Sequence, residues 1–220
     1  PNLNTSMDLL AKKWAHHGAI SLQGDTNSEP AWYVFGVGKV TTPGLSANDH
    51  PEFIGKSIIN DHGTYVYFSS PSKGLLYCYQ YRSDGHLIEQ LTYKMNVQRF
   101  GSSLLMQGTS GGDALNPLLL AGITSITMSG KLESDTYIID KQARSSFKNI
   151  IIDNFSIDRI TDTIDLAVDN HDELKLFCND DDLVITDTSN NIIVTIRKIL
   201  GKEKSDYNHL KLITNDGITK

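Results

Sequence analysis

Apolar and polar residues alternate along most of this chain, in short runs that are rich in β-branched and aromatic side chains. The longest such stretch extends from Leu132 to Thr219, where the runs are separated by Asp, Asn, Ser and Gly. Alternation with a period of two, bounded by turn residues, is typical of β-strands. The pattern therefore predicts a mainly β protein.

One segment near the start has a helical period instead. Its apolar residues recur at helical spacing: Met7, Leu10, Ala11 and Trp14. Thr5 or Ser6 can cap the first turn, and Gly18 can supply the left-handed residue that ends a helix. Residues 1–18 are therefore predicted to form an N-terminal helix.

Residues 19–99 are predicted to form an antiparallel β meander. Strands at 19–23 and 31–40 flank a turn at 24–27, and Gly36 and Gly38 are expected to weaken or bulge the second strand. Further turns are expected at 60–63 and 71–74. The strongest hairpin signal is Asp84-Gly85, because this dipeptide between alternating runs favours a two-residue type I′ loop.

The Asp84-Gly85 hairpin implies a definite register, in which Ser83 and His86 close the loop. The pairs that follow are Tyr81 with Ile88, Tyr79 with Gln90, and Tyr77 with Thr92. Three tyrosines would then share one face of the hairpin. If that face is exposed, the rigid rings with polar tips suit recognition of a protein or a sugar; if it is buried, the rings are core.

Together with two aromatic residues of the preceding strand, these tyrosines are the candidate binding residues. The set is Trp32, Tyr33, Tyr77, Tyr79 and Tyr81. No catalytic residues are proposed, because the chain contains no GxSxG elbow, HExxH helix or P-loop. A catalytic effector would instead require a cleft with a titratable cluster drawn from His50, His62 and His86.

The second half of the chain is predicted to begin after a break. Residues 100–122 have the Gly and Ser content of a linker or bend. Residues 123–220 are predicted to form a β-roll, a β-solenoid-like module or a sandwich-like module. Within it, near-continuous β-branched runs at 183–187 and 192–199 predict a hairpin around Ser189-Asn190-Asn191, covered on both faces.

Five short motifs occur in order in this module. They are Asp135-Thr136-Tyr137-Ile138-Ile139, Asp162-Thr163-Ile164, Asp182-Leu183-Val184-Ile185, Val194-Thr195-Ile196 and Asn215-Asp216-Gly217-Ile218-Thr219. In these motifs residues 123–219 resemble the C-terminal region of repeat-in-toxin proteins, the haemolysin-type calcium-binding family. The resemblance implies a β-roll, secretion, and a place in a large bacterial toxin.

The calcium repeat of that family is degenerate in this chain. The matching stretch, Ser129 to Asp135, holds one glycine and places Lys131 near where a divalent cation would bind. The module is therefore expected to stand without calcium or another cofactor. The alternative is a weak calcium site at Asp180 and Asp182, in an acidic run that otherwise forms a solvated turn.

The net charge narrows the classes of partner that the chain is expected to bind. The net charge of −6 disfavours nucleic acid and anionic membranes. No apolar run approaches the roughly 20 residues of a membrane-spanning helix.

Cys78 and Cys178 each lie in an apolar run, which predicts two buried thiols, or a disulfide if their strands are neighbours. The start lacks Met and an apolar signal segment, so we expect a piece of a longer secreted protein.

Three functions remain open. The first is a non-catalytic module of a large secreted bacterial toxin that mediates or supports attachment to a host-cell receptor or glycan. The second is a purely structural scaffold or shell domain of that toxin, which predicts that the three hairpin tyrosines are buried. The third is a catalytic effector domain of unrecognised type.

Overall fold

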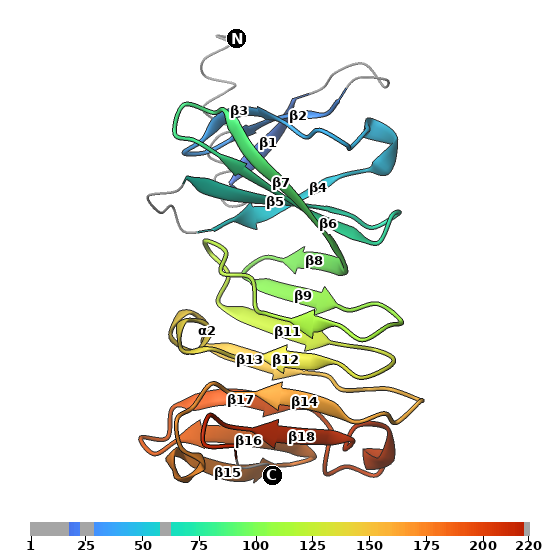
Figure 1. Cartoon of the computed structure of the whole chain (residues 1–220), viewed down its shortest axis with the longest axis vertical. Helices are drawn as coiled ribbons and strands as arrows, with labels where there is room; N and C mark the ends of the chain where they lie inside the picture. Colours follow the sequence, from blue (N-terminus) through green and yellow to red (C-terminus); the bar gives the residue numbers. More distant parts are fainter. Residues whose placement is uncertain (1–17, 23–28, 58–62, 218–220) are drawn as a thin grey trace. The chain divides into compact units, whose positions relative to one another are not determined.

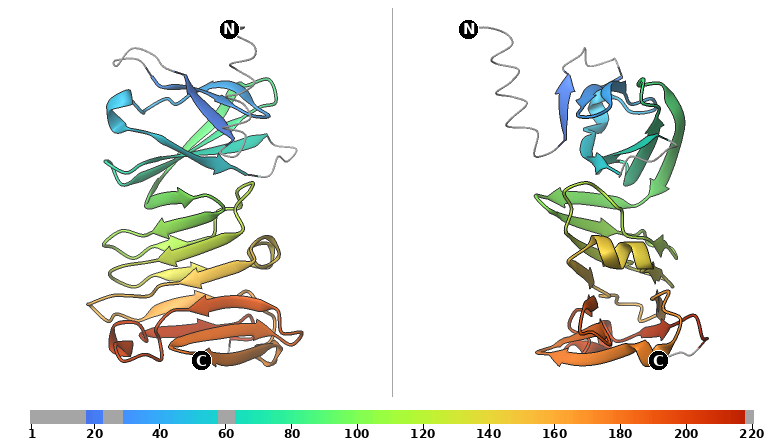
Figure 2. Two further views of the ribbon diagram at one scale, coloured as in Figure 1. Left: turned by 180° about the vertical axis from the view of Figure 1, so that it is seen from behind. Right: turned by 90° about the vertical axis from the view of Figure 1, so that its left-hand side faces the viewer.

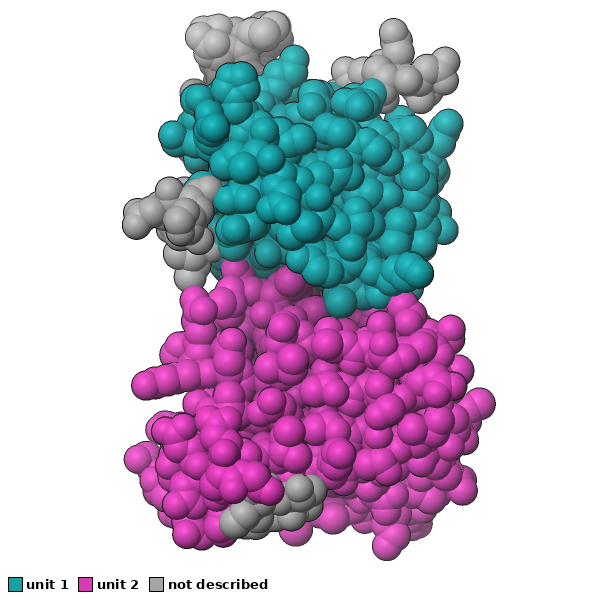
Figure 3. Space-filling model, in the orientation of Figure 1, with its two compact units in different colours: residues 1–97, 120–122 teal, residues 98–119, 123–220 magenta. Residues whose placement is uncertain are grey.

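The computed structural model describes residues 18–22, 29–57 and 63–217. The protein is mainly β, as predicted, with 48% of residues in strands distributed over several sheets. The chain divides into two compact units (Figure 3): Pro1–Val97 with Leu120–Gly122, and Gln98–Leu119 with Ile123–Lys220. The helix predicted for residues 1–18 lies outside the described residues, apart from Gly18, which is in a turn.

The first unit begins with a three-stranded antiparallel sheet, in the order β1-β2-β3 (Figure 1). Its strands are β1 (Ala19–Leu22), β2 (Ala31–Val34) and β3 (Gly38–Thr41). The prediction of one strand over 31–40 is therefore wrong. The chain reverses after Val34, whose carbonyl accepts the N–H of Val37 at 3.0 Å, and Gly36 takes the left-handed backbone (φ +83°) that this turn requires.

The second sheet of this unit is the predicted antiparallel meander, in the order β4-β5-β6-β7. Its strands are β4 (Glu52–Lys56), β5 (Thr64–Ser70), β6 (Leu75–Tyr81) and β7 (Leu87–Lys94), and the 3-10 helix η1 (Ala47–Asp49) precedes them. The predicted register is confirmed along most of the hairpin. Tyr77 pairs with Thr92, and Tyr79 pairs with Gln90.

The hairpin loop differs from the prediction. Arg82 and His86 close a three-residue loop, in which the Arg82 N–H donates to the His86 carbonyl at 2.8 Å. Gly85 has φ +85°, and Tyr81 pairs with Leu87 across a bulge rather than with Ile88. The three-residue loop needs a left-handed residue only at Gly85, whereas a type I′ turn needs one at both central positions.

The two sheets of the first unit enclose an aromatic core. The ring of Trp32 lies 5.0 Å from that of Phe68, and Phe68 lies 5.9 Å from Tyr79, centroid to centroid. Ala19, Val34, Val40, Leu45 and Val66 complete the buried cluster. Cys78 is buried on the opposite face of β6 from Tyr77 and Tyr79, whereas Cys178 in the second unit is exposed, and both thiols are free. The prediction of a buried Cys178 is wrong, and no disulfide joins the two cysteines.

In the second unit the chain alternates between two sheets. One has the order β15-β16-β17-β13-β11-β9-β8, and the other has the order β10-β12-β14-β18. The strands are β8 (Asn96–Phe100), β9 (Ser103–Gln107), β10 (Ala114–Leu115), β11 (Ser125–Ser129), β12 (Thr136–Ile138), β13 (Asn149–Ile152), β14 (Asp162–Asp165), β15 (Leu174–Asn179), β16 (Asp182–Asp187), β17 (Ile192–Ile196) and β18 (Leu210–Ile213). The short elements α2 (Lys141–Ser146), η2 (His171–Glu173) and η3 (Lys204–Asp206) lie between them.

Matching strands of this unit stack in parallel, as the two further views show (Figure 2). We use the word level for each consecutive pair that contributes one strand to each sheet: β9–β10, β11–β12, β13–β14 and β17–β18. Matching residues of successive levels are buried between the sheets. One such row is Leu104, Ile126 and Ile150, and the facing row is Leu115, Tyr137, Ile164 and Leu212.

Two local predictions for this unit have different outcomes. Residues 100–122 are not a linker, because they contain β9 and β10, the first level. The predicted hairpin around residues 189–191 is confirmed, because β16 and β17 are antiparallel. A second hairpin, β15–β16, precedes it and separates the third level from the fourth.

Candidate functional site

The tyrosines predicted to bind a partner lie in the core of the first unit. Tyr77, Tyr79 and Tyr81 have exposed fractions of 5%, 0% and 2%. The hydroxyl of Tyr79 donates to the carbonyl of Pro43, and that of Tyr81 donates to Thr41, both at 2.7 Å. Burial raises the pKa of both phenols. These three side chains therefore support the sheet packing and offer no surface to a partner.

The two other predicted aromatic residues are separated from each other by the sheet. Trp32 is buried against Phe68, whereas Tyr33, the next residue of β2, is 42% exposed and packs edge-on against Phe35 at 5.6 Å. Successive residues of a strand point to opposite faces, which explains this separation. Of the five predicted binding residues, Tyr33 is the exposed one.

The weak calcium alternative falls on the loop of the β15–β16 hairpin. Asp180 has φ +52° in this loop, and Asp182 begins β16. One carboxylate oxygen of Asp182 accepts the backbone N–H of Lys198 at 2.8 Å. Within residues 18–22, 29–57 and 63–217, no group of three or more His, Cys, Asp or Glu side chains is placed to hold a metal ion.

The histidines of the catalytic alternative lie on turns of the first unit. His50 follows η1 with a left-handed backbone, and His86 follows the hairpin loop. His62 lies outside the described residues.

No helix in the described part of the chain is long and apolar enough to cross a membrane.

The second unit has a groove of about 720 Å³ on the outer face of its seven-stranded sheet. Its floor includes a row of polar side chains at matching positions of four strands: Gln107, Ser129, Asp153 and Arg197. Gln107 pairs with Ser129, while Asp153 and Arg197 directly follow the paired Ile152 and Ile196. Because the preceding residue on each strand is buried, these four side chains point outward.

The wall of the groove comes from the loop after β13 and from the region near η3. Phe155 is 47% exposed and Ile157 is 74% exposed, while Tyr207 is buried with its ring 5.5 Å from that of Phe155. Asp158 holds this loop by accepting the hydroxyl of Ser156 and the N–H of Ile160. The Ser156 hydroxyl is the main cause of the lowered pKa of Asp158. Tyr207 therefore supports the ring of the exposed Phe155, and Asp158 holds the loop that carries it.

A second loop, which follows β11, brings Lys131 and Leu132 to the groove. Lys131 has φ +85° and Glu133 has φ +66°, a backbone region that costs a residue with a side chain about 1–2 kcal/mol. The Glu133 N–H donates to Asp158 at 2.6 Å, and the Gly130 N–H donates to the hydroxyl of Tyr137 at 2.9 Å. The first bond ties the two loops of the groove together, and the second anchors the residue before Lys131 to β12.

Charged groups in the groove retain capacity for a ligand. The guanidinium of Arg197 lies 3.9 Å from the carboxylate of Asp153, which is longer than a hydrogen bond. The two side chains are 42% and 35% exposed, so both are open to solvent. The groove residues found in the described part of the chain include neither Cys nor His. The lining also includes the apolar side chains of Leu105, Leu132 and Ile157, so the arrangement suits a ligand with both polar and apolar faces better than activation of a nucleophile.

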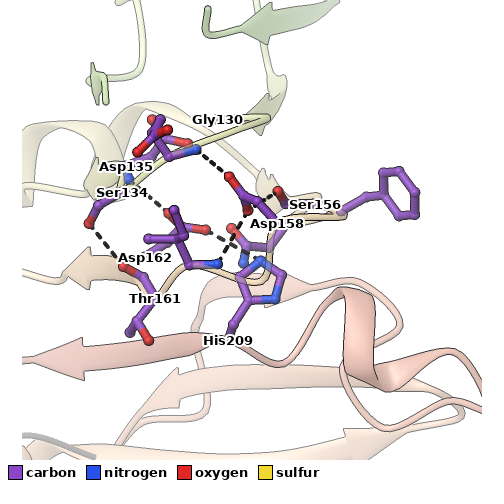
Figure 4. A network of polar contacts seen from close by, with 12 residues as sticks. Gly130, Ser134, Asp135, Ser156, Asp158, Thr161, Asp162 and His209 are labelled. Carbon is purple, nitrogen blue, oxygen red and sulfur yellow. Dashed lines mark hydrogen bonds and ion pairs between the residues drawn. The ribbon is translucent and has the colours of Figure 1, made fainter. Parts of the chain in front are cut away.

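A buried polar ladder lies between the sheets, behind the loops of the groove (Figure 4). Asp135 and Asp162 occupy the same position on successive levels, each just before or at the start of its strand, with exposed fractions of 1% and 2%. The carboxylate of Asp135 accepts the N–H of Asp113 at 2.8 Å, and that of Asp162 accepts the N–H of Asp135 at 2.7 Å. His209 ends the ladder, 3.6 Å from Asp162.

Burial raises the pKa of both inner carboxyl groups, that of Asp135 to about 7. The other carboxylate oxygen of Asp135 has no hydrogen-bond partner among the described residues and is packed against Gly130. A Cβ atom at position 130 would lie 1.9 Å from this oxygen, so only glycine fits. Gly108 makes a similar close approach one level earlier, where a Cβ atom would lie 2.6 Å from the carboxylate of Asp113.

The groove residues were missed from the sequence because they come together only when the levels stack. A signal was present in the paired motifs Leu104-Leu105-Met106-Gln107-Gly108 and Ile126-Thr127-Met128-Ser129-Gly130. Each ends in the glycine that precedes a ladder aspartate by the same spacing. The third copy has Asn154 at the glycine position, which hides the repeat.

Compared with known proteins, the chain matches no family model and no curated protein sequence.

Proposed function

We propose that this chain is a non-catalytic β-rich module of a large secreted bacterial toxin, and that it attaches the toxin to the target-cell surface through the groove of the second unit. The observation that carries the proposal is the polar row of the floor beside the half-exposed ring of Phe155. An exposed aromatic side chain that is fixed by packing is a typical binding anchor. The partner is a host-cell surface protein or glycan.

The toxin context rests on the resemblance of residues 123–219 to repeat-in-toxin proteins. The alternation of the chain between two sheets, in which the strands of successive levels pair in parallel, supports a short β-roll of the solenoid type for this unit. Lys131 supports a β-roll that does not depend on calcium, because the degenerate turn carries a cationic residue, whose side chain lines the groove, in place of an oxygen ligand. We further propose that the module is secreted as part of a longer chain and does not bind nucleic acid.

The test is binding of the fluorescently labelled chain to cultured animal cells. Saturable binding that falls at least several-fold in Phe155→Ala is expected. Phe177→Ala is the matched control, because Phe177 has the same exposed fraction of 47% but lies on β15 and does not line the groove. Equal binding by both variants would remove the groove from the attachment function.

A structural scaffold is the second candidate. The burial of Tyr77, Tyr79 and Tyr81 favours it, because a shell domain needs a rigid core and no aromatic surface on the hairpin. The cell-binding experiment separates the two functions. A folded chain that shows no saturable binding to any cell type would favour the scaffold.

A further inference from the structure

We propose that the groove binds an acidic oligosaccharide, an inference that rests on the attachment function proposed above. Three properties of the groove point to this ligand class: the spacing of its polar floor, the exposed ring on its wall, and its local charge. Strand pairing fixes the spacing of the floor, and packing against Tyr207 supports the ring on the wall.

The floor suits a chain of sugar rings. Gln107, Ser129 and Asp153 lie on neighbouring parallel strands, which are about 4.8 Å apart, and Arg197 continues the row. The row therefore repeats an amide, a hydroxyl, a carboxylate and a guanidinium at regular intervals. Amide, carboxylate and guanidinium groups can each pair with two adjacent sugar hydroxyls, which both donate and accept.

A peptide fits this floor less well. An extended peptide binds most readily by adding a strand to an open sheet edge. The floor strands β9, β11, β13 and β17 are all interior strands of the seven-stranded sheet, with a neighbour on each side. Recognition on this face must therefore use side chains alone, as it does for a ligand with many hydroxyl groups.

The wall provides an aromatic face. Phe155 is 47% exposed although its neighbours Asn154 and Ser156 are buried, and Tyr207 supports its ring from 5.5 Å. The C–H face of a sugar ring packs on such a ring, while its hydroxyls remain free for the floor. A fixed ring loses little conformational freedom when it binds.

The charge favours an acidic sugar. Two cationic side chains, Lys131 and Arg197, line the groove together with one carboxylate, Asp153, although the whole chain carries −6. The planar N–H pairs of Arg197 match a carboxylate or a sulfate, and the loose 3.9 Å contact with Asp153 leaves donors for it. Lys131 has a left-handed backbone that glycine would adopt more readily, so this turn carries a lysine at a cost in stability.

The experiment applies the whole chain to an array of oligosaccharides in matched sets, with neutral, carboxylated and sulfated members on the same backbone. Calorimetry then measures the affinity of the member that binds most tightly. Acidic members are expected to bind at least about tenfold tighter than neutral ones, a difference of about 1.4 kcal/mol. Their binding should weaken between about 0.1 M and about 1 M salt, where the Debye length falls from about 10 Å to about 3 Å.

Variants assign the effect to the groove. Arg197→Gln should abolish the preference for acidic members, and Phe155→Ala should weaken acidic and neutral members alike, by about tenfold. Lys211→Gln, at an exposed position of β18 on the other sheet, and Phe177→Ala are the controls and should leave binding unchanged. Circular dichroism of each variant confirms that it is folded.

The outcomes separate this inference from the attachment function. Equal binding of acidic and neutral members overturns the charge argument and with it the inference. If no oligosaccharide binds while cell binding still depends on Phe155, the inference is overturned. Attachment to a protein receptor then remains. Binding of acidic members without any cell binding supports the inference and removes the attachment function.

Discussion

Asp162 accepts the backbone N–H of Asp135 with its carboxylate at 2.7 Å, between two levels of the second unit. The bond joins equivalent positions of adjacent levels, and the Asp113–Asp135 bond repeats it one level earlier. A side chain thus supplies an acceptor to a buried N–H at the turn into the strand. The ladder places ionisable groups where the desolvation cost of a charge is high.

The ladder predicts that stability falls as pH rises. The folded-state pKa of Asp135 is raised to about 7, above an unfolded value of about 3.9, so the native state binds more protons between these values. The stabilising contribution is full below about pH 4 and is lost as pH approaches about 7. The free energy of unfolding, measured with denaturant, should decrease by about 2 kcal/mol between pH 5 and pH 7.

Asp135→Asn is the control for this pH dependence. Asparagine keeps an oxygen that can accept the Asp113 N–H, but it does not titrate. The slope between pH 5 and pH 7 should flatten in this variant, and a slope equal to that of the unmodified chain would assign the titration to another group.

The close approach of Gly130 to Asp135 predicts a steric effect. Gly130→Ala would place a methyl carbon 1.9 Å from the carboxylate oxygen, and relieving this clash should cost about 1–3 kcal/mol. Gly111→Ala is a matched control in a neighbouring turn, because its nearest atom would be 3.8 Å away. Thermal melts should show a lowered Tm for the first variant alone; similar melts for both would contradict the packing around Asp135.

The tyrosine row predicts a stability effect in place of a binding effect. Tyr79→Phe removes a buried hydroxyl and leaves the Pro43 carbonyl without its 2.7 Å partner, which should cost about 1–2 kcal/mol. Tyr33→Phe, at an exposed ring, should leave the free energy of unfolding within about 0.5 kcal/mol of the original. A neutral result for Tyr79→Phe, by denaturant unfolding, would argue against the hydroxyl contact.

Calcium should leave the stability of the protein unchanged. A bound ion would raise Tm by mass action, but Lys131 lies in the turn of the degenerate repeat and Asp182 is engaged by the Lys198 N–H. The measurement is a thermal melt with millimolar calcium chloride and again with a chelator. A Tm that rises by several degrees with calcium would contradict the degenerate-repeat interpretation.

Local features of this fold could be predicted from the sequence, and features formed by stacking could not. Asp84-Gly85 gave the correct pairing of Tyr79 with Gln90, because a hairpin register depends on residues close in sequence. Residues 100–122 were misread as a linker because glycines suggest flexibility. Gly108 and Gly112 lie there instead because Asp113 and the Ser134 carbonyl come within 2.6 Å and 2.7 Å of a Cβ position.

The groove could not be predicted from the sequence for the same reason, because it is formed by the stacking of levels. Ser129, Asp153 and Arg197 are far apart in the chain, and the β15–β16 hairpin interrupts the spacing between the last two. Their alignment depends on parallel pairing across three strands, which no short motif encodes. Alternation likewise showed that the tyrosines share a face but did not show which face is inward, since both faces of the hairpin have mixed polarity.

The β15–β16 hairpin also sets a limit on self-assembly. Stacked parallel levels form a surface on which another copy can add its own strands and so begin a fibre. At this end of the seven-stranded sheet, β16 occupies the edge of β17 in the antiparallel sense, and β15 covers β16 in turn. A second copy therefore meets the antiparallel strand β15 at this edge, so the parallel stacking of levels does not continue there.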